Sequence, residues 1–523
     1  GVAIGNETQL FLDDWMVERM TGLKRTLHQP VKKGLVREAD GQPWTWGVGP
    51  SVVRDSTGRF HMVYRAGWSD PGVRDLHPSI GNDKAQWIRR TCAYARSEDG
   101  IRWTKPLLGL LDGPTGLRRA SKEKWKDGLF SEPIGFSKEN NLGCPIAVIQ
   151  DVGLFGGVGD PKRRYLVNVL YRSDTHNFAP ISDAGLYFAA DVPDILNDPD
   201  WRSRMEPIRE GPERGPRGET THVTGFDQHR NRWFVCTQSR MGGWSMRGGR
   251  DISRYASKDL IHWSPDELVL PIADDESRDP EDWIEYMELS AFRAGGLWLG
   301  QLVIFHGDRT SRQYLMPGRE NVWRKGTTEL RLVASRDAGE SWDRVCGKQV
   351  WLPHSEEKYG TDRMLYPGCP VRVGDELWLY YSAYDGDHLV WNSDGTLYDK
   401  KRPGRVGRIA LATLRWDGYV SLDAGERSEE LVTKPLQFVG DELIVNLHAP
   451  QGMLLVELLD ASGKPIGGFT ASDCRPIRGD GVSLPVSWRG EGSLEKLQDR
   501  TIRVRFSLTN AAFYSFRFVQ GGC

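Results

Sequence analysis

One short pattern recurs five times along the 523-residue chain, about every 80 residues, and it constrains the fold more than any other feature. Each copy is a small apolar strand ending in Ala-Ser or a close variant, followed by an acidic residue and often by a Trp. The copies occupy residues 93–103, 187–196, 255–263, 332–342 and 409–422. Such a period predicts a repeat architecture, in which each copy contributes one supersecondary unit.

A second pattern alternates with the first and predicts a β-hairpin in each repeat. Two runs of β-branched and aromatic residues flank a turn that contains Gly or Asp. The copies occupy residues 50–67, 145–172, 223–240, 289–307 and 369–386. A hairpin plus a third strand and the Ser/Asp/Trp turn makes a four-stranded sheet, so the sequence predicts an all-β fold with a five-bladed β-propeller over residues 1–427. A solenoid or a pair of sandwiches is the alternative, but solenoid repeats are rarely this long.

Two further expectations concern the ends of the chain. Residues 9–15 precede the first full blade, and we expect them to supply the strand that closes the ring. The repeat stops near residue 427, and residues 428–523 show alternating strands separated by turns. This stretch predicts a small antiparallel β-sandwich, which would be an accessory domain packed on the propeller.

Composition and motifs exclude several classes of function. The chain has 69 basic and 71 acidic residues and a net charge of −2, so it lacks the basic excess of a nucleic-acid-binding protein. It has no apolar run long enough to span a membrane. Seven Cys form no CxxC pair, and no metal-ligand or phosphate-loop motif occurs, so neither a metal nor a cofactor is expected. The oligomeric state is not assigned.

The innermost strand of a propeller blade starts at one mouth of the central funnel, so candidate site residues precede each hairpin. Blades two to five offer carboxylates there. Cleavage of a glycosidic bond needs two of them, a protonated carboxyl for the leaving oxygen and a carboxylate for water or the anomeric carbon. The predicted catalytic residues are Glu219, Glu285 and Asp362.

Other polar and aromatic residues near the same mouth are predicted to bind substrate. They are Asp14, Trp46, Asn140, Asn141, His222, Glu288, His306, Arg363 and His388. Glu285 and Glu288 are three residues apart, so on a regular strand they point to opposite faces, and only a bulge would bring both toward the funnel.

The blades resemble those of the five-bladed propeller glycoside hydrolases, the invertase-like and arabinanase-like enzymes of families 32 and 43. The pieces that carry the resemblance are LFLDDWMVE (residues 10–18), SVVRDSTGRFHMVYRA (51–66), YASKDLIHW (255–263) and DELWLYYSAYDGDH (375–388). It covers about residues 9–425 and is weak as a pointer to one substrate. The resemblance implies a secreted or periplasmic glycosidase that degrades a plant or algal polysaccharide from its ends and places its blade-three acid near Glu219.

One departure from the family pattern leaves the reaction open. The family carries an Asp at the start of blade one, where this chain has Gly49-Pro50. Either the first carboxylate comes from elsewhere, such as Asp14, or the enzyme works differently, or catalysis is lost. The alternatives are therefore a catalytically silent sugar-binding propeller, or a lyase or phosphorylase. The secreted or periplasmic location is inferred from the glycosidase function that the resemblance implies, because residues 1–8 have no signal-peptide pattern.

Overall fold

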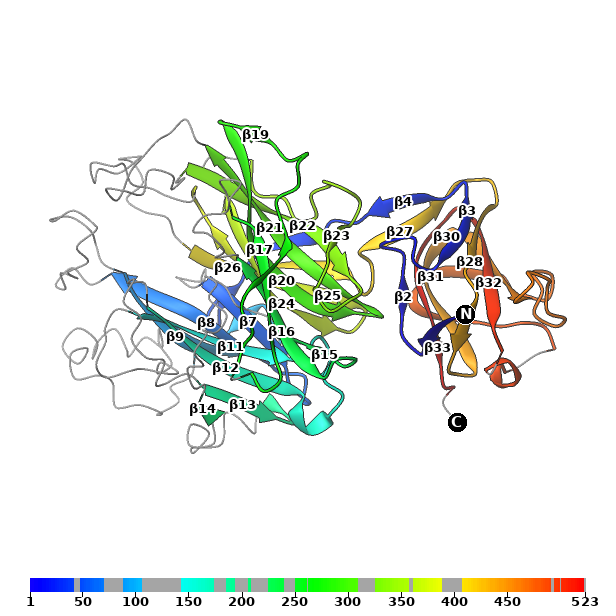
Figure 1. The fold of residues 1–523 in the computed structure, drawn as a ribbon, viewed down its shortest axis with the longest axis horizontal. Helices are drawn as coiled ribbons and strands as arrows, with labels where there is room; N and C mark the ends of the chain where they lie inside the picture. Colours follow the sequence, from blue (N-terminus) through cyan, green and yellow to red (C-terminus); the bar gives the residue numbers. More distant parts are fainter. Residues whose placement is uncertain are drawn as a thin grey trace.

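The structure is a computed structural model. It describes residues 1–41, 48–69, 88–105, 143–173, 185–192, 206–207, 224–238, 250–260, 262–308, 325–356, 361–387, 407–490, 493–498 and 500–521. These residues are nearly all strand, turn and loop, and they form two units that Figure 1 shows side by side. No helix among them is long and apolar enough to cross a membrane.

The larger unit contains five blades, and the predicted five-bladed propeller is confirmed. Blade one contains β7 (Val48–Arg54), β8 (Phe60–Ser69) and β9 (Ile88–Ser97), followed by the short β10 (Arg102–Trp103), which pairs with β6 (Arg37–Glu38). Blade two contains β11 (Gly143–Asp151), β12 (Tyr165–Ser173), β13 (Gly185–Ala189) and β14 (Glu206–Pro207), with the short 3-10 helix η2 (Pro161–Arg163) between its first two strands. Blade three contains β15 (Thr224–Asp227), β16 (Arg232–Gln238), β17 (Ile252–Ser257) and β18 (Glu267–Leu270).

The last two blades are the most completely described. Blade four contains β19 (Arg278–Asp279), β20 (Asp282–Ala294), β21 (Leu297–Asp308), β22 (Lys325–Ser335) and β23 (Asp343–Arg344). Blade five contains β24 (Met364–Val373), β25 (Glu376–Tyr384), β26 (Gly407–Arg415) and β5 (Val31–Leu35). Among the innermost strands, β7 lies beside β24 and β11, and β20 lies beside β24 and β15.

The recurring Ser/Asp/Trp pattern folds into the same turn in three blades. In each, the Ser hydroxyl accepts a backbone N–H 2.8 Å away, at Gly100, Leu260 and Gly339. The Asp carboxylate accepts further backbone N–H groups, and the indole of Trp103 or Trp263 donates to a carbonyl of the turn. A short polar side chain that satisfies turn amides explains why these residue types recur at this position.

The ring is closed by a different strand from the one that we expected. β5 pairs with β26 as the outermost strand of blade five, whereas β2 (Gln9–Leu10), in the predicted closing segment, pairs with β33 (Ala511–Val519) of the other unit. The prediction for residues 9–15 is therefore wrong. Leu10, Phe11 and Leu12 are buried, and Leu10 and Leu12 join a core that includes residues of blades four and five.

The second unit is built from both ends of the chain, which corrects the expected boundary between residues 1–427 and 428–523. β1 (Val2–Gly5), β2, β3 (Val17–Thr21), β4 (Lys24–Leu27) and β27 (Val420–Ala424) all pair within it. Its other strands are β28 (Glu429–Thr433), β29 (Leu436–Phe438), β30 (Glu442–Asp460), β31 (Ile477–Val486), β32 (Ile502–Thr509) and β33, and it also holds the 3-10 helix η3 (Glu495–Leu497). In Figure 1, β4 and β27 run from the propeller into this unit.

The longest strand organises the core of the second unit. The first part of β30 pairs with β33, and its second part, from Met453 to Asp460, pairs with β32. One apolar cluster lies among these strands, and it includes Phe438 and Phe518, whose rings stack 3.9 Å apart. Residues from β1 and from the segment after β2 belong to the same cluster, so both chain ends are needed to bury it.

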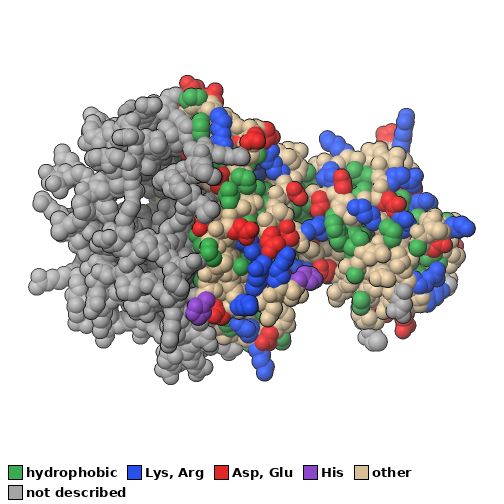
Figure 2. All heavy atoms as spheres, in the orientation of Figure 1, with side chains coloured by type: hydrophobic (Ala, Val, Ile, Leu, Met, Phe, Trp, Pro, Cys, Tyr) green, Lys and Arg blue, Asp and Glu red, His purple; other side chains and the backbone are tan. Residues whose placement is uncertain are grey.

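Charge is mixed over the described surface. On the face drawn in Figure 2, acidic and basic side chains alternate over both units. No described patch on that face gathers one sign of charge, so the view offers no broad surface for a nucleic acid.

Candidate functional site

The innermost strand of blade four carries two buried glutamates near its start. The register between β20 and β21 shifts between Tyr286 and Glu288, because Met287 forms a β-bulge. Glu285 lies opposite Phe305, and Glu288 lies opposite Val303, so the bulge puts both glutamates on one face of the sheet. Each is about 1% exposed. The structure therefore supplies the bulge that would bring the two predicted site residues together.

A buried arginine from blade three approaches this pair. One terminal nitrogen of Arg250 lies 3.2 Å from a carboxylate oxygen of Glu285. The backbone carbonyl of Arg250 accepts a hydrogen bond from the N–H of Tyr286, 2.9 Å away, next to the bulge. Its guanidinium also lies over the ring of Phe305, 5.6 Å from the centroid. Arg250 thus supplies positive charge beside Glu285, where an isolated buried carboxylate would be costly.

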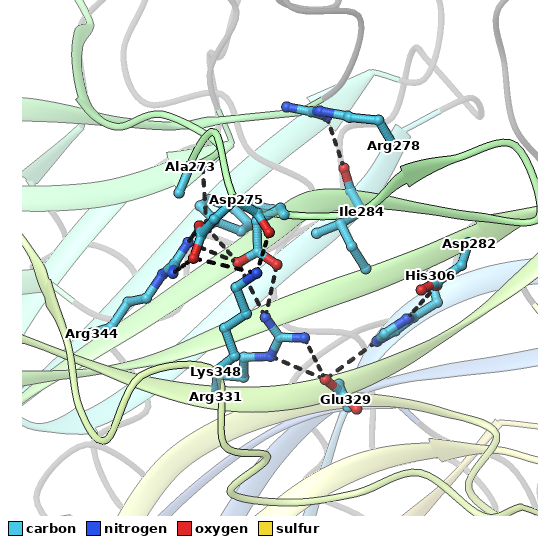
Figure 3. Close-up of polar contacts among 12 residues, drawn as sticks. Ala273, Asp275, Arg278, Asp282, Ile284, His306, Glu329, Arg331, Arg344 and Lys348 are labelled. Carbon is cyan, nitrogen blue, oxygen red and sulfur yellow. Dashed lines mark hydrogen bonds and ion pairs between the residues drawn. The ribbon is translucent and has the colours of Figure 1, made fainter.

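His306 lies at the end of β21 between two carboxylates, as Figure 3 shows. Its Nδ1 lies 2.7 Å from Asp282, and its Nε2 lies 3.3 Å from Glu329. Burial alone would lower the pKa of His306, but the interactions with Glu329 and Asp282 outweigh it and raise the pKa above the usual value. Burial opposes the shift of Glu329 too, yet His306 and Arg331 hold its pKa below the usual value. Both shifts favour the charged forms, so His306 is placed to form ion pairs with the two carboxylates.

The network continues away from His306 into the segment that joins blades three and four. Arg331 lies 3.0 Å from Glu329 and 3.0 Å from Glu276, and the hydroxyl of Tyr286 donates to Glu276 at 3.0 Å. Arg344 contacts Glu276 at 3.1 Å. Burial and the nearby Glu276 raise the pKa of Tyr286, which keeps its hydroxyl protonated. These contacts fix the entry to β20, and so they position the strand that carries the glutamates.

Asp362 lies just before β24, but its carboxylate contacts the outer part of blade five. Lys32, on the closing strand β5, lies 2.6 Å from one Asp362 oxygen, and the hydroxyl of Tyr381 donates to the same oxygen at 3.3 Å. The Asp362 side chain is 8% exposed. This ion pair joins the innermost and outermost strands of the last blade, so the structure gives Asp362 a role in closing the ring.

Arg363 is also held by neighbours within blade five. Its guanidinium lies 3.0 Å from Asp387 and donates to the carbonyl of Ser355 at 2.9 Å. The ring of His354 lies 6.2 Å from the ring of His306, centroid to centroid. Burial and the charge of Arg363 lower the pKa of His354, whereas the pKa of His306 is raised. Arg363 and His306 thus border the same region between blades four and five.

Asp14 lies far from Glu285. It forms an ion pair with Arg25, 2.7 Å away, and its side chain is 72% exposed. The adjacent Asp13 contacts Arg336, just past the end of β22. The end of β22 pairs with Trp298 of β21, and Glu285 pairs with Phe305 of the same strand. These two positions on β21 are seven residues apart, which corresponds to about 23 Å along a strand. The structure does not bring Asp14 to the mouth that holds the glutamates.

The start of blade one has a backbone that suits glycine. Gly49 has a positive φ of 61°, and its N–H donates to the buried Ser382 hydroxyl at 2.7 Å. An Asp there would adopt a conformation that L-residues rarely take. The remaining predicted site residues lie outside the described part of the chain, namely Glu219, Trp46, Asn140, Asn141, His222 and His388.

Sequence reasoning missed most of the residues that surround the glutamates. No sequence pattern marked Arg250 as a site residue, because it lies just before a strand of the repeat and belongs to no motif. Glu329 and Arg331 did carry such a pattern, since they alternate with Leu330 and Leu332 in β22, where a buried charged side chain needs a partner. Glu276 lies in the connection before β20, a stretch that resembles an exposed acidic loop.

The described residues present no group of three or more His, Cys, Asp or Glu side chains placed to hold a metal ion. The side chains near the start of β20 are of the types that carry acid–base chemistry. Two carboxyl groups share one face, one of them beside a guanidinium, and His306 lies between two carboxylates near the end of the neighbouring strand.

The fold defines the class of the larger unit as an all-β, five-bladed propeller, and comparisons with known proteins add only likeness of fold. No family model and no curated protein matches the chain. The solved structures that resemble it include an N-acetylgalactosamine deacetylase from F. plautii, with 15% identity, a TM-score of 0.41, and coverage of 76% of this chain and 97% of that chain.

Two further solved structures show the same level of likeness. A family 43 arabinoxylan arabinofuranohydrolase from Bacillus subtilis has 11% identity and a TM-score of 0.35, covering 91% of this chain and 96% of its own. A β-1,2-mannobiose phosphorylase from Listeria innocua has 12% identity and a TM-score of 0.38, covering 71% of this chain and 90% of its own. Glycoside hydrolases are thus among the proteins that this chain resembles, and likeness at this level bears on no reaction.

Proposed function

We propose that the chain is a carbohydrate-active enzyme, a glycoside hydrolase that removes sugars from the ends of a plant or algal glycan. The observation that carries this proposal is the buried pair of Glu285 and Glu288 on one face of β20. Burying two carboxyl groups near each other costs stability, and such costs are typical of catalytic sites. Hydrolysis of a glycosidic bond needs one carboxyl group as an acid and a second as a base or nucleophile.

The contacts of the two glutamates support a division of roles. Arg250 balances the charge of Glu285, so we assign Glu285 the role of the carboxylate that activates water or attacks the anomeric carbon. Glu288 is proposed as the group that protonates the leaving oxygen, and Glu219 stays a prediction for the same task. The ion pair with Lys32 makes Asp362 a positioning residue in this proposal.

Substitution of the glutamates tests the proposal. Purified protein is screened against nitrophenyl glycosides and natural oligosaccharides, and products are followed by chromatography. Glu285→Gln and Glu288→Gln are each expected to lower kcat at least about 100-fold, the usual effect of losing a general acid or base. The matched control is Glu457→Gln, because Glu457 is also buried beside an arginine, Arg505 at 2.6 Å, but belongs to the second unit. Full activity of Glu285→Gln would refute the assignment.

A second candidate, a sugar-binding propeller without catalysis, is favoured by one observation. Gly49, in a left-handed conformation, occupies the position where the family that the sequence resembles carries its blade-one Asp. Saturable sugar binding without any product over days would support this candidate. A requirement for phosphate, or an unsaturated product that absorbs ultraviolet light, would instead indicate a phosphorylase or a lyase.

A further inference from the structure

A pocket of about 470 Å³ lies where the innermost strands of blades one, two and five end. The glutamate pair lies near the start of an innermost strand, so the pocket belongs to the other mouth of the propeller. The volume falls within the range of small-molecule sites. Its walls include three arginines, one from each blade: Arg54, Arg164 and Arg372.

Two of these arginines are held by an aromatic ring and a backbone carbonyl. The guanidinium of Arg54 lies 5.4 Å from the centroid of Phe60, and that of Arg372 lies 4.2 Å from the centroid of Trp416. The Nε of Arg54 donates to the carbonyl of Gly58 at 2.8 Å, and the Nε of Arg372 donates to the carbonyl of Gly374 at 3.2 Å. Within the described chain, neither guanidinium forms an ion pair with a carboxylate. The terminal nitrogens of both, which are partly exposed, remain able to donate to a ligand.

The acidic residues of the pocket are mostly engaged elsewhere. Asp55 is held by His61 at 2.8 Å and by three donors of its own turn. Asp151 is paired with Arg164 at 2.7 Å. Asp375 is exposed at the rim. The walls contain three Arg and three Asp, and Arg54 and Arg372 are the two arginines that form no ion pair with the described carboxylates of the wall.

The rest of the wall is apolar. Leu154 is 38% exposed, and Phe155, Pro370 and Val371 continue the same surface. A guanidinium matches a carboxylate through two parallel hydrogen bonds, and an apolar wall suits the carbon face of a sugar ring. The ligand that satisfies both is a ring that carries hydroxyls and one carboxylate.

We propose that this pocket binds a uronic acid residue of an acidic glycan. The carboxylate lies between Arg54 and Arg372, and the ring lies against Leu154. The site is separate from the glutamate pair, so binding here does not depend on the proposed hydrolysis, and either can fail without the other.

Calorimetric titration of the full chain with sodium D-glucuronate tests the proposal, with D-glucose as the neutral counterpart. Glucuronate is expected to bind saturably and at least ten-fold more tightly than glucose, and more weakly as salt is raised. Arg54→Gln and Arg372→Gln should each weaken binding at least ten-fold. The control is Arg478→Gln, because Arg478 also donates to a backbone carbonyl, that of Gly452 at 2.8 Å, but in the second unit.

Unchanged melting temperatures of the variants separate loss of the ligand contact from loss of the fold. If one pocket variant fails to fold, the other still gives the comparison with Arg478→Gln. The proposal is overturned by equal binding of glucose and glucuronate, by absence of saturable binding, or by unchanged affinity in the folded pocket variants. Acetate that binds as tightly as glucuronate would also overturn it, because the sugar ring would then contribute nothing.

Discussion

Lys32→Met should destabilise the protein more than Asp362→Asn, although the two substitutions break the same ion pair. The charged atoms are 2.6 Å apart, and the two side chains differ in exposure, 30% for Lys32 and 8% for Asp362. Removing Lys32 leaves a buried carboxylate with the Tyr381 hydroxyl as its other hydrogen-bond partner, at a cost of about 3–4 kcal/mol. Removing the charge of Asp362 leaves an ammonium that can reach water, and we expect a cost of about 1–2 kcal/mol.

Urea unfolding of the single variants and of Lys32→Met/Asp362→Leu measures these costs. The double variant should recover much of the lost stability, since a buried ion pair is often replaced by apolar groups at little cost. Equal costs for the two single variants, or a larger cost for Asp362→Asn, would refute this account of the ring closure. Activity per folded molecule should survive in Asp362→Asn, and a loss of turnover without a loss of stability would instead restore Asp362 as a catalytic residue.

Three further predictions concern stability. His306 has a raised pKa in the folded protein, so its contribution to the free energy of unfolding is fully present below about pH 6.5 and is lost as the pH rises through the raised pKa. Urea unfolding between pH 5 and 9 should show this loss of stability in wild type but not in His306→Ala. Parallel pH profiles of the two proteins would contradict the prediction. Asp337→Ala removes the acceptor of three turn hydrogen bonds and should cost about 1–2 kcal/mol, with a smaller loss for Asp337→Asn; equal losses would exclude this role. The pair of Arg19 and Glu430 has exposures of 58% and 29%, so Arg19→Ala should cost less than about 1 kcal/mol, and a larger loss in thermal unfolding would refute the estimate.

The propeller could be predicted from the sequence because its information is local and repeated. Each hairpin and each Ser/Asp/Trp turn is formed by neighbouring residues, and the hydrogen bonds of Ser97, Ser257 and Ser335 are equivalent. The closing strand could not be identified in this way. β5 has the sequence VKKGL, which shows little apolar alternation, and its partner β26 is nearly four hundred residues away.

The sequence predicted the C-terminal strands of the second unit but not its N-terminal strands, because these also pair with distant residues. Its C-terminal strands alternate clearly, but β1 to β4 complete it from the other end of the chain. No local pattern links Val2 to Leu436, which pair across the two ends. The sequence around Leu10 resembles a propeller strand, and its apolar residues are indeed buried, at the junction of the two units.

The sequence predicted where along the chain the candidate site residues lie, but it did not predict which side chains contact them. The rule that inner strands start at the funnel led to Glu285 and Glu288, and His306 was chosen because it ends the hairpin of the same blade. Whether the two glutamates share a face depends on the bulge at Met287, and a one-residue change in register is set by the packing of the whole sheet. Arg250 reaches Glu285 from another blade, so no spacing in the sequence relates them.

Chemical rescue tests the central claim, that the Glu285 carboxylate takes part in glycoside cleavage. Glu285→Ala is assayed on the best substrate of the screen, with and without sodium azide or formate. We predict that the small anion restores turnover in Glu285→Ala and, if it attacks the sugar, that a glycosyl azide forms, while wild type and Glu457→Ala do not respond. Undiminished turnover in Glu285→Ala without any added anion would contradict the claim.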